Sequence, residues 1–381
     1  MIELGVIADD LTGGMMVASL LEREGVHCPL VTSTEVLNNL QSDAEAVVIG
    51  RKIRLITPTA AVTDANNSAS GLVAAGAKRI YYKYCATFDS TEEGNIGPIA
   101  EGLMSALNTD RTIFCPAFPE YSVTIFQGRM FLGNIMLGES NKRFDPVTPM
   151  TNSNLVEVLA AQTTGKAGII PHSTLIAGKE VAQTYVDNQV VDGTGLFVTD
   201  ATDNADVASI AQLTLDWPLT TGADALPMFL ARAWRDEAPA AAKTARTSQT
   251  PHLLPAAPGY EAIIAGSCAE ATRAQLDYFE ASHPVDRINL LATSEHFETE
   301  LKNWAKSRLE EGPIAVATSA DVEEVKRIQT ELGVKGAAQL ADKLLGKAAM
   351  ILRHLGARKF MVAGGETSGQ VFASLGIAHV Q

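Results

Sequence analysis

Short apolar runs alternate with segments of helical periodicity along most of this chain, and this alternation constrains the fold more than any other sequence feature. Leu4–Ala8 is a short apolar run, and the segment after it carries apolar side chains at helical spacing until Gly25. The same order recurs in both halves of the chain. A buried strand followed by an amphipathic helix is the βαβ unit, whose strands are parallel. The sequence therefore predicts an α/β fold with mainly parallel sheets flanked by helices.

The expected strands share a short apolar core and a turn or helical pattern behind it. They lie at Leu4–Ala8, Ala46–Ile49, Ile80–Cys85, Thr112–Cys115, Gly168–Ile170, Leu196–Thr199, Tyr260–Ala265, Asp286–Leu291, Ile314–Thr318 and Lys359–Ala363. Residues 116–149 break the rhythm, because they are aromatic, punctuated by glycine and weakly periodic. This segment favours a β-hairpin insertion or a lid over a crossover helix.

Residues 236–258 separate two series of such units. This segment holds four prolines, many alanines and no amphipathic period, which is typical of a linker. A chain of 381 residues is long enough for two or three domains of roughly 100–200 residues. We therefore divide the chain at about residue 245 into two domains, residues 1–245 and residues 246–381.

The chain is acidic, with a net charge of −14 and a pI near 5.0. Residues 259–381 hold 13 basic and 16 acidic side chains, a net charge of −3, which leaves −11 for residues 1–258. Nucleic acids and anionic membranes attract basic surfaces, so neither is an expected partner. An anionic ligand of the acidic half must be held by a few placed cations and backbone N–H groups.

Cysteine and histidine usage indicates a compartment but no metal site. The four cysteines lie far apart without a C-x-x-C pair, which predicts free thiols in a reducing cytosol. The N-terminus lacks the basic region of a signal peptide, and no apolar run reaches the ~18 residues of a membrane span. We expect a cytoplasmic protein. No H-x-x-x-H pair occurs, so no metal ligand set is identified.

Asp9 and Asp10 end the first expected strand and precede Thr-Gly-Gly at the start of a helix. Ligands of open α/β sheets bind outside the carboxyl ends of the strands, which is where this pair lies. A helix cap accounts for Asp10 alone but does not require two carboxylates. Paired acids here favour a hydroxyl-binding or general-base role, or a metal.

A second candidate group follows the strand that ends near Lys83. A lysine in an apolar strand is unfavourable unless it is paired or faces a site, and Asp89, Ser90 and Asn95 supply polar groups on the loop behind it. The alternative is a capped turn with Lys83 on an exposed face. Arg51 lies in a cation cluster at another strand end, and we expect it to bind a substrate carboxylate.

Two glycine turns of the second half are candidates for phosphate binding. Ser267 lies in the first turn, and the second comprises Gly364, Gly365, Glu366 and Thr367; each follows an expected strand and opens a helix. Exposed N–H groups at a helix N-terminus bind phosphate, and glycine allows close approach. Cys268 offers a rival role as a nucleophile at a helix N-terminus, but no histidine motif accompanies it.

These motifs resemble those of the four-carbon acid sugar kinase family, especially its 3-oxo-tetronate kinase branch. The matching segments span nearly the whole chain: I-A-D-D-L-T-G at 7–13, Y-K-Y-C-A-T-F-D-S-T-E-E-G-N-I-G at 82–97, P-A-F-P at 116–119, F-Q-G at 126–128, D-P-V-T-P-M-T-N-S-N-L at 145–155, G-S-C at 266–268 and A-G-G-E-T-S-G at 363–369. The resemblance implies an N-terminal sugar-acid-binding domain and a C-terminal ATP-binding domain.

The resemblance also implies that ATP, with Mg²⁺, phosphorylates a hydroxyl of a small four-carbon acid such as 3-oxo-tetronate, erythronate or threonate. In this mechanism, Asp10 or Asp9 orients and deprotonates the hydroxyl, while Lys83 and Arg51 hold the carboxylate. Asp89, Ser90 and Asn95 fall in the family's substrate-side motifs. Homo-oligomerisation is left open.

Several positions depart from the family pattern and support an alternative. Met16 stands where the family commonly has an aspartate, Val123 stands where it has an arginine, and the sequence ends at Gln381, before the family's usual end. The alternative is a catalytically divergent protein of the same fold that binds a carboxylate or a nucleotide without transferring phosphate.

Overall fold

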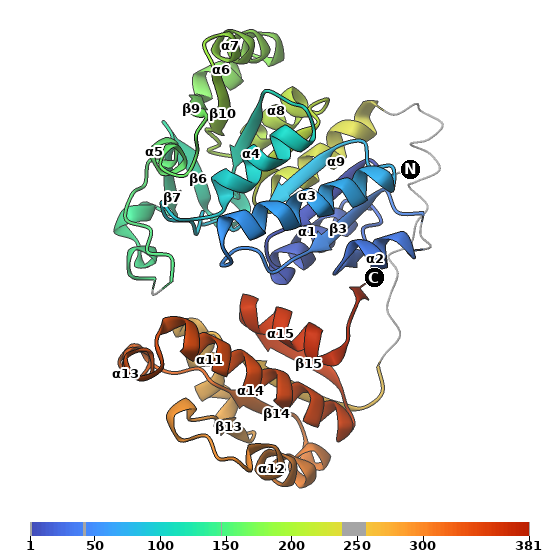
Figure 1. Ribbon diagram of the computed structural model, residues 1–381, viewed down its shortest axis with the longest axis vertical. Coiled ribbons are helices and arrows are strands. Elements are labelled where there is room, and N and C mark those ends of the chain that lie inside the picture. The colour runs from blue at the N-terminus through green and yellow to red at the C-terminus, as the bar shows by residue number, and fades with distance from the viewer. Residues whose placement is uncertain (1, 41–42, 146, 238–256, 381) are drawn as a thin grey trace. The chain divides into compact units, whose positions relative to one another are not determined.

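The structure is a computed structural model that describes residues 2–40, 43–145, 147–237 and 257–380. The chain divides into two compact units (Figure 1). The first comprises Met1–Pro251 together with His379–Gln381, and the second comprises His252–Ala378. The expected boundary at residue 245 lies outside the described residues.

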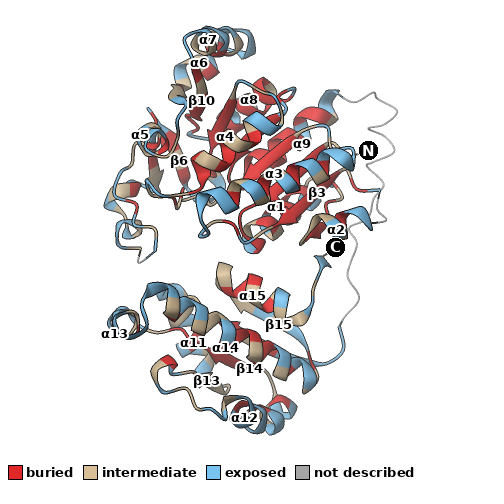
Figure 2. Ribbon diagram, viewed as in Figure 1, coloured by how far each residue is buried: buried red, intermediate tan, exposed pale blue. Residues whose placement is uncertain are grey.

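A sheet forms the centre of the first unit. Within the described residues it has nine strands, and all neighbouring pairs are parallel except the pair formed by the C-terminal strand. In spatial order the strands are β16 (His379–Val380), β2 (Leu30–Val31), β3 (Ala46–Gly50), β1 (Leu4–Ala8), β4 (Ile80–Lys83), β11 (Leu219–Gly222), β5 (Thr112–Cys115), β10 (Thr194–Thr199) and β9 (Lys166–Ile170). Every residue of β1, β3 and β4 is buried (Figure 2), as expected where helices cover both faces.

The helices of this unit form two packed groups. One contains α1 (Leu11–Arg23), α9 (Leu226–Glu237) and α8 (Asn204–Thr214), followed by α6 (His172–Ile176) and α7 (Lys179–Val191). The other contains α2 (Thr34–Asn38), α3 (Pro58–Ala74), α4 (Ile96–Ala106) and α5 (Leu155–Ala160). Figure 1 shows α3 and α4 in front of the sheet. Helix α1 begins after its N-cap residue, Asp10. Gly14 allows the helix to pack directly against the strands, since a Cβ at this position would lie 2.9 Å from Leu30 Cδ1.

The expected insertion is a small antiparallel sheet in the first unit. It consists of β6 (Val123–Phe126), β7 (Arg129–Leu132) and β8 (Ile135–Met136). Three single turns of 3-10 helix flank it, at Pro119–Tyr121, Leu137–Glu139 and Asn141–Phe144. The backbone is left-handed at Ser122 and Gln127, which reverses the chain at both ends of β6. The hairpin interpretation is confirmed, with one strand more than expected.

The second unit repeats the α/β plan on a smaller scale. Its sheet is parallel, and the strands described are, in spatial order, β13 (Val285–Arg287), β14 (Ile314–Ala317), β12 (Tyr260–Ala265) and β15 (Ala357–Ala363). The helices are α11 (Glu270–Glu280), α12 (Phe297–Glu311), α13 (Val322–Leu332), α14 (Val334–His354) and α15 (Gly365–Leu375). The main core lies between the sheet and α12, α14 and α15, with Ile264, Leu345 and Leu352 inaccessible to solvent.

The structure confirms the predicted fold class, and all ten expected strands are present to within a few residues. Outside the insertion, three of the described strands were not expected, namely β2, β11 and β16. The strand predicted at Asp286–Leu291 ends at Arg287 and continues into a turn of 3-10 helix at Leu290–Ala292, because Asn289 accepts a hydrogen bond from the Leu291 N–H and caps that turn.

Candidate functional site

The candidate substrate site lies at the carboxyl edge of the central strands of the first unit. Strands β1, β4 and β11 are neighbours, and their registers pair Lys83 with Ala8 on one side and with Gly222 on the other. Asp9 and Asp10 (hereafter the aspartate pair) follow β1 directly, and Asp224 follows β11. Parallel strands end at one edge of a sheet, so these side chains converge where ligands of α/β proteins bind.

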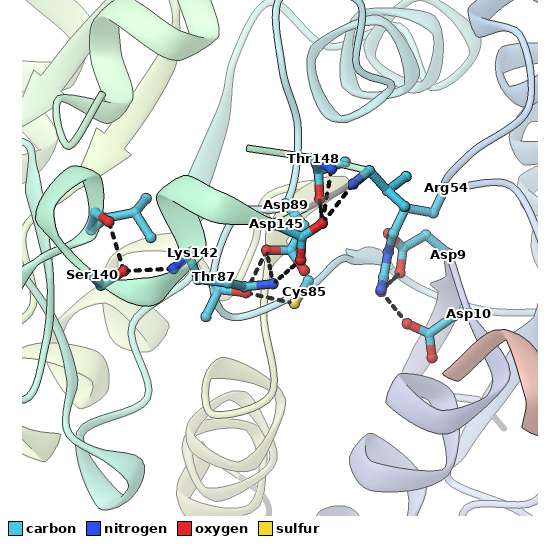
Figure 3. Close-up of polar contacts among 12 residues, drawn as sticks. Asp9, Asp10, Arg54, Cys85, Thr87, Asp89, Ser140, Lys142, Asp145 and Thr148 are labelled. Atoms are coloured by element: carbon cyan, nitrogen blue, oxygen red, sulfur yellow. Dashed lines mark hydrogen bonds and ion pairs between the residues drawn. The ribbon is translucent and has the colours of Figure 1, made fainter. Parts of the chain in front are cut away.

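Arg54 binds both members of the aspartate pair. Its Nε and Nη2 donate to the two carboxylate oxygens of Asp9, each at 2.8 Å, and Nη2 also donates to Asp10 Oδ2 (Figure 3). Asp9 is 2% exposed and Asp10 is 7% exposed, so each would be unfavourable as an unpaired charge. Arg54 Nη1 makes no hydrogen bond within the described residues and remains a donor for a ligand.

Asp10 is held as an anion by several groups at once. Its Oδ1 accepts a hydrogen bond of 2.6 Å from the N–H of Gly13 at the start of α1. Burial raises the pKa of Asp10, but the charges of Arg54 and Lys83 and the Gly13 hydrogen bond outweigh it and hold this pKa below its ordinary value. Gly13 allows Lys83 to approach closely, since a Cβ at position 13 would lie 2.6 Å from Lys83 Nζ and would displace it.

Lys83 is 2% exposed and points into the cluster, which excludes the alternative of an exposed face. Its Nζ lies 3.3 Å from Asp224 Oδ1 and donates to the carbonyl oxygen of Tyr84 at 2.8 Å. Burial lowers the pKa of Lys83, but Asp224 and the aspartate pair outweigh it and raise this pKa. Burial raises the pKa of Asp224, and the aspartate pair adds to this effect while Lys83 opposes it.

Arg51 and Asn95 were both expected to bind substrate. Arg51 lies in the loop after β3, and Asn95 forms hydrogen bonds to that loop. Arg51 pairs with Asp64 on α3, with Nε and Nη2 at 2.7 and 2.6 Å from the carboxylate oxygens, and it also donates to the Thr32 carbonyl oxygen. Asn95 donates from Nδ2 to the carbonyl oxygens of Ile53, Arg54 and Ile56. Asn95 thus holds the loop that carries Arg54, whereas Arg51 anchors that loop to α3.

A second polar cluster follows β4. Thr87 donates to Asp89 Oδ1 at 2.6 Å, and Lys142 Nζ lies 2.9 Å from the same oxygen and 3.2 Å from Asp145 Oδ2 (Figure 3). Burial lowers the pKa of Lys142, but Asp89 outweighs it and raises this pKa. Burial and the charge of Asp89 raise the pKa of Cys85, whose Sγ lies 3.0 Å from Thr87 Oγ1. Ser90 is buried and donates to Gln162 Oε1 at 3.1 Å.

Sequence reasoning did not identify Arg54, Asp224 or Lys142 as site residues. Arg54 belongs to the cation cluster from which only Arg51 was chosen. Asp224 follows a strand that the apolar pattern did not reveal, and its signal is a carboxylate just beyond Thr221-Gly222. Lys142 lies in the 3-10 turn Asn141–Phe144 of the insertion, and its sequence carries no signal for a site.

The predicted phosphate turns lie at the carboxyl edge of the second sheet. Gly266 and Ser267 both donate backbone hydrogen bonds to Ala363 O, at 2.9 and 3.1 Å, so the turns after β12 and β15 are adjacent. A Cβ on Gly266 would lie 2.1 Å from Thr367 Oγ1, and Gly364 has φ +125°. Neither α11 nor α15 has a side-chain hydrogen bond at its N-cap, which leaves N–H groups suited to an anion.

The loop after β14 adds hydroxyl groups that the sequence analysis did not select. Ser319 donates to Ser267 O at 2.6 Å. The Thr318 hydroxyl is buried and has no hydrogen-bond partner within the described residues, so it is available to a ligand. Gly365 has open space where a Cβ would be. Glu366 lies in the first turn of α15, where Ser368 donates from both N and Oγ to Gly364 O.

Three further observations concern metal ligands, Cys268 and the hydrophobicity of the helices. Among the described residues, no group of three or more His, Cys, Asp or Glu side chains is arranged to hold a metal ion. Cys268 is exposed, and its Sγ lies 3.9 Å from Gly266 O. No helix within the described part of the chain is both long and apolar enough to cross a membrane.

Comparisons with known proteins bear on both sites. Residues 4–230 match a family model described as a sugar-binding N-terminal domain, and residues 262–381 match one described as a nucleotide-binding C-terminal domain. Two curated relatives, from Burkholderia multivorans and Pseudomonas fluorescens, are named 3-oxo-tetronate kinase. Each is 37% identical to this chain, covering 99% of it and 87% of the relative. A crystal structure from Salmonella typhimurium LT2 matches with a TM-score of 0.81 and 32% identity, covering 100% of this chain and 89% of the other.

The two matched domains and the curated relatives show a kinase that acts on a sugar acid and uses ATP. The chain belongs to the four-carbon acid sugar kinase family, as its motifs predicted. Kinase activity and nucleotide binding are therefore confirmed as properties of the chain, at the level of a phosphotransferase acting on a sugar acid.

Proposed function

We propose that this kinase transfers the γ-phosphoryl group of ATP to a hydroxyl of a four-carbon sugar acid such as 3-oxo-tetronate, erythronate or threonate. The observation that carries the proposal is the buried cluster of Arg54, Lys83, Asp224 and the aspartate pair at one strand edge. Cations for a carboxylate and acceptors for hydroxyls are the groups that a small sugar acid needs.

Within this site, the acid's carboxylate interacts with Arg54 through the remaining Nη1 donors and with Lys83. Sequence analysis predicted Arg51 for this role; because its fork is already bound to Asp64, we propose Arg54 instead and keep Arg51 as the alternative. The aspartate pair accepts hydrogen bonds from the substrate hydroxyls and keeps Arg54 in place. Asp89, Ser90 and Asn95 line or support the same region, and Lys142 extends it towards the insertion.

On the nucleotide side, Ser267 and the turn from Gly364 to Thr367 hold ATP phosphates, chiefly through backbone N–H groups. We place the boundary between the two functional domains near residue 245, as the composition of the linker indicates. Mg²⁺ in such enzymes is usually held by one or two protein carboxylates, substrate phosphates and waters, and Glu366 in the first turn of α15 would supply such a carboxylate. When bound, Mg²⁺ neutralises phosphate charge.

The proposal is tested with purified full-length protein, Mg-ATP and a panel of 3-oxo-tetronate, erythronate and threonate. We expect acid-dependent ADP release with at least one of the three acids and a matching phosphorylated product by mass spectrometry. ADP release that does not depend on the acid would be ATP hydrolysis alone. No acid-dependent ADP from the panel would refute the proposal.

Calorimetry separates the kinase from the divergent binder that Met16 and Val123 suggest. A divergent binder gives heat on titration with a sugar acid but forms no phosphorylated product when ATP is added. Met16 is 37% exposed on α1, whereas Val123 is buried in the insertion. The substitutions Met16→Asp and Val123→Arg restore the family residues and show which departure limits turnover.

A further inference from the structure

We propose that Asp224 is the general base that takes the proton from the substrate hydroxyl during phosphoryl transfer. This assignment rests on the proposed function and deepens it, because it names a residue for one step of the same reaction. From the sequence, Asp10 or Asp9 is expected in this role. The contacts of the three carboxylates distinguish among them.

The aspartate pair has its oxygens occupied by strong donors. Both oxygens of Asp9 accept from Arg54, whereas Asp10 accepts from Gly13 N at one oxygen and from Arg54 at the other. At Asp10, charge-assisted hydrogen bonding from Arg54 favours the ionised form and lowers the affinity for a proton. The lowered pKa of Asp10 agrees with this arrangement. These carboxylates are suited to hold Arg54 and to orient a hydroxyl.

Asp224 is less constrained by donors. Its Oδ1 forms an ion pair with Lys83 Nζ at 3.3 Å, and Oδ2 has no hydrogen bond or ion pair among the described residues and is left for a ligand. The side chain is 12% exposed. Burial and the nearby aspartate pair raise its pKa, as in bases tuned by a low-polarity site and like charges. The charged and titratable groups around it are Lys83, Asp9, Asp10 and Tyr81.

The loop that carries Asp224 is rigidly built. Tyr81 donates from its hydroxyl to Ala223 O at 2.7 Å, and Ala223 N donates to Cys115 O at 3.1 Å. Gly222 allows this close approach, since a Cβ there would lie 2.4 Å from Cys115 O and 2.5 Å from the Tyr81 hydroxyl. Asp224 is thus placed by strands on both sides of β11, as a reacting group must be.

Phosphoryl transfer to the substrate hydroxyl needs no reactant other than ATP and the sugar acid. The substrate oxygen forms a bond to the γ-phosphorus of ATP, and the bond from that phosphorus to the bridging oxygen breaks, with its electron pair remaining on ADP. The hydroxyl proton moves to Asp224 Oδ2. Lys83 stabilises the ionised base before the transfer, and the proton returns to solvent after product release.

The test compares Asp224→Asn with the wild-type enzyme, using the panel acid that gives the highest turnover at saturating Mg-ATP. We expect kcat to fall at least about 100-fold, the lower range for loss of a general base, with the KM for ATP unchanged. The acidic limb of the kcat profile against pH, which reports the base in the enzyme–substrate complex, is expected to disappear. Asp224→Glu keeps a carboxylate, and we expect it to retain the limb with reduced kcat.

Asp206→Asn is the matched control. Asp206 is also a buried carboxylate of the first unit, but it accepts from Thr202 and contacts His172 outside the cluster. Its substitution is expected to lower thermal stability and to leave the acidic limb in place. If Asp224→Asn keeps kcat within tenfold while Asp10→Asn loses the limb, the base is Asp10, and the kinase proposal stands. An inactive wild-type enzyme overturns both proposals.

Discussion

At the scale of single residues, Arg54 compensates the negative charge of the aspartate pair. It is the bidentate partner of Asp9 and a donor to Asp10, and both carboxylates are buried. Removal of one member of a buried ion pair leaves the other charges uncompensated and typically costs about 3–5 kcal/mol. Arg54 therefore links the stability of the domain to its substrate site.

We predict that Arg54→Ala lowers the free energy of unfolding by about 3–5 kcal/mol at pH 7 and raises the KM for the acid. In the wild type the pKa of Asp10 is lowered, so its stabilising contribution is present above the ordinary pKa and lost as the pH falls through the folded value. The variant lacks this contribution, so its deficit is largest at neutral pH and becomes smaller only below pH 3.8, the ordinary pKa of the carboxyl. Urea unfolding at about pH 7 and about pH 3 measures the difference.

Arg51→Ala provides the control for Arg54. The Arg51–Asp64 pair keeps about a quarter of each side chain exposed (28% and 25%), so solvent screening reduces its contribution to ~1 kcal/mol. We expect a small loss of stability and an unchanged KM for the acid. A large rise in KM with Arg51→Ala and none with Arg54→Ala would return the carboxylate-binding role to Arg51.

The residue types of the site could be predicted from sequence, but not all of the pairings. Two carboxylates and a lysine at the ends of apolar strands indicated a site, because charges there need partners or ligands. Arg51 and Arg54 lie in one loop, and their roles depend on which side chain meets Asp64 on α3. That choice is made by packing between segments distant in sequence, so the local pattern does not contain it.

At the scale of elements, the insertion contributes a charge to the site. Lys142 bridges Asp89 of the loop after β4 and Asp145 of its own segment. We predict that Lys142→Ala raises the KM for the sugar acid several-fold with little change in the KM for ATP, because the loop of Asp89 loses its tether. Steady-state kinetics with each substrate varied in turn measures the effect.

Arg143→Ala is the matched control for Lys142. Its guanidinium lies over the ring of Phe144, 5.3 Å from the centroid, and Phe144 is 76% exposed. Loss of this cation is expected to leave both KM values unchanged. Equal effects of the two substitutions would mean that the general charge of the insertion matters, not the contact with Asp89.

The strands that could be predicted from the sequence differ from the others in their apolar character and their length. Apolar strands such as β1 and β3 are buried along their whole length, so their hydrophobic runs are evident. The missed strand β11 reads Leu-Thr-Thr-Gly, and its polar side chains are satisfied inside the sheet, as where Thr221 donates to Ile113 O at 2.6 Å. Strands β2 and β16 have two residues each, too few for a pattern.

At the scale of the whole molecule, the net negative charge and the buried cations have opposite effects on substrate capture. The net charge is −14, of which −11 lies in residues 1–258 with the sugar-acid site. Both proposed substrates are anions, so the long-range field repels them and the cations of the buried cluster attract them only at close range. Salt screens the long-range field much more than the buried contacts.

We therefore predict that kcat/KM for the sugar acid stays constant or rises as ionic strength increases from about 20 to 200 mM, a range over which the Debye length falls to below ~10 Å. An enzyme that steers anions with a positive surface shows the reverse, a steep fall with salt. Initial rates at constant free Mg²⁺ and pH measure the trend, with KCl and potassium acetate compared so that a specific anion competing for the site is recognised. A steep fall in both salts would mean that exposed cations, and not the buried Arg54 and Lys83, govern capture of the acid.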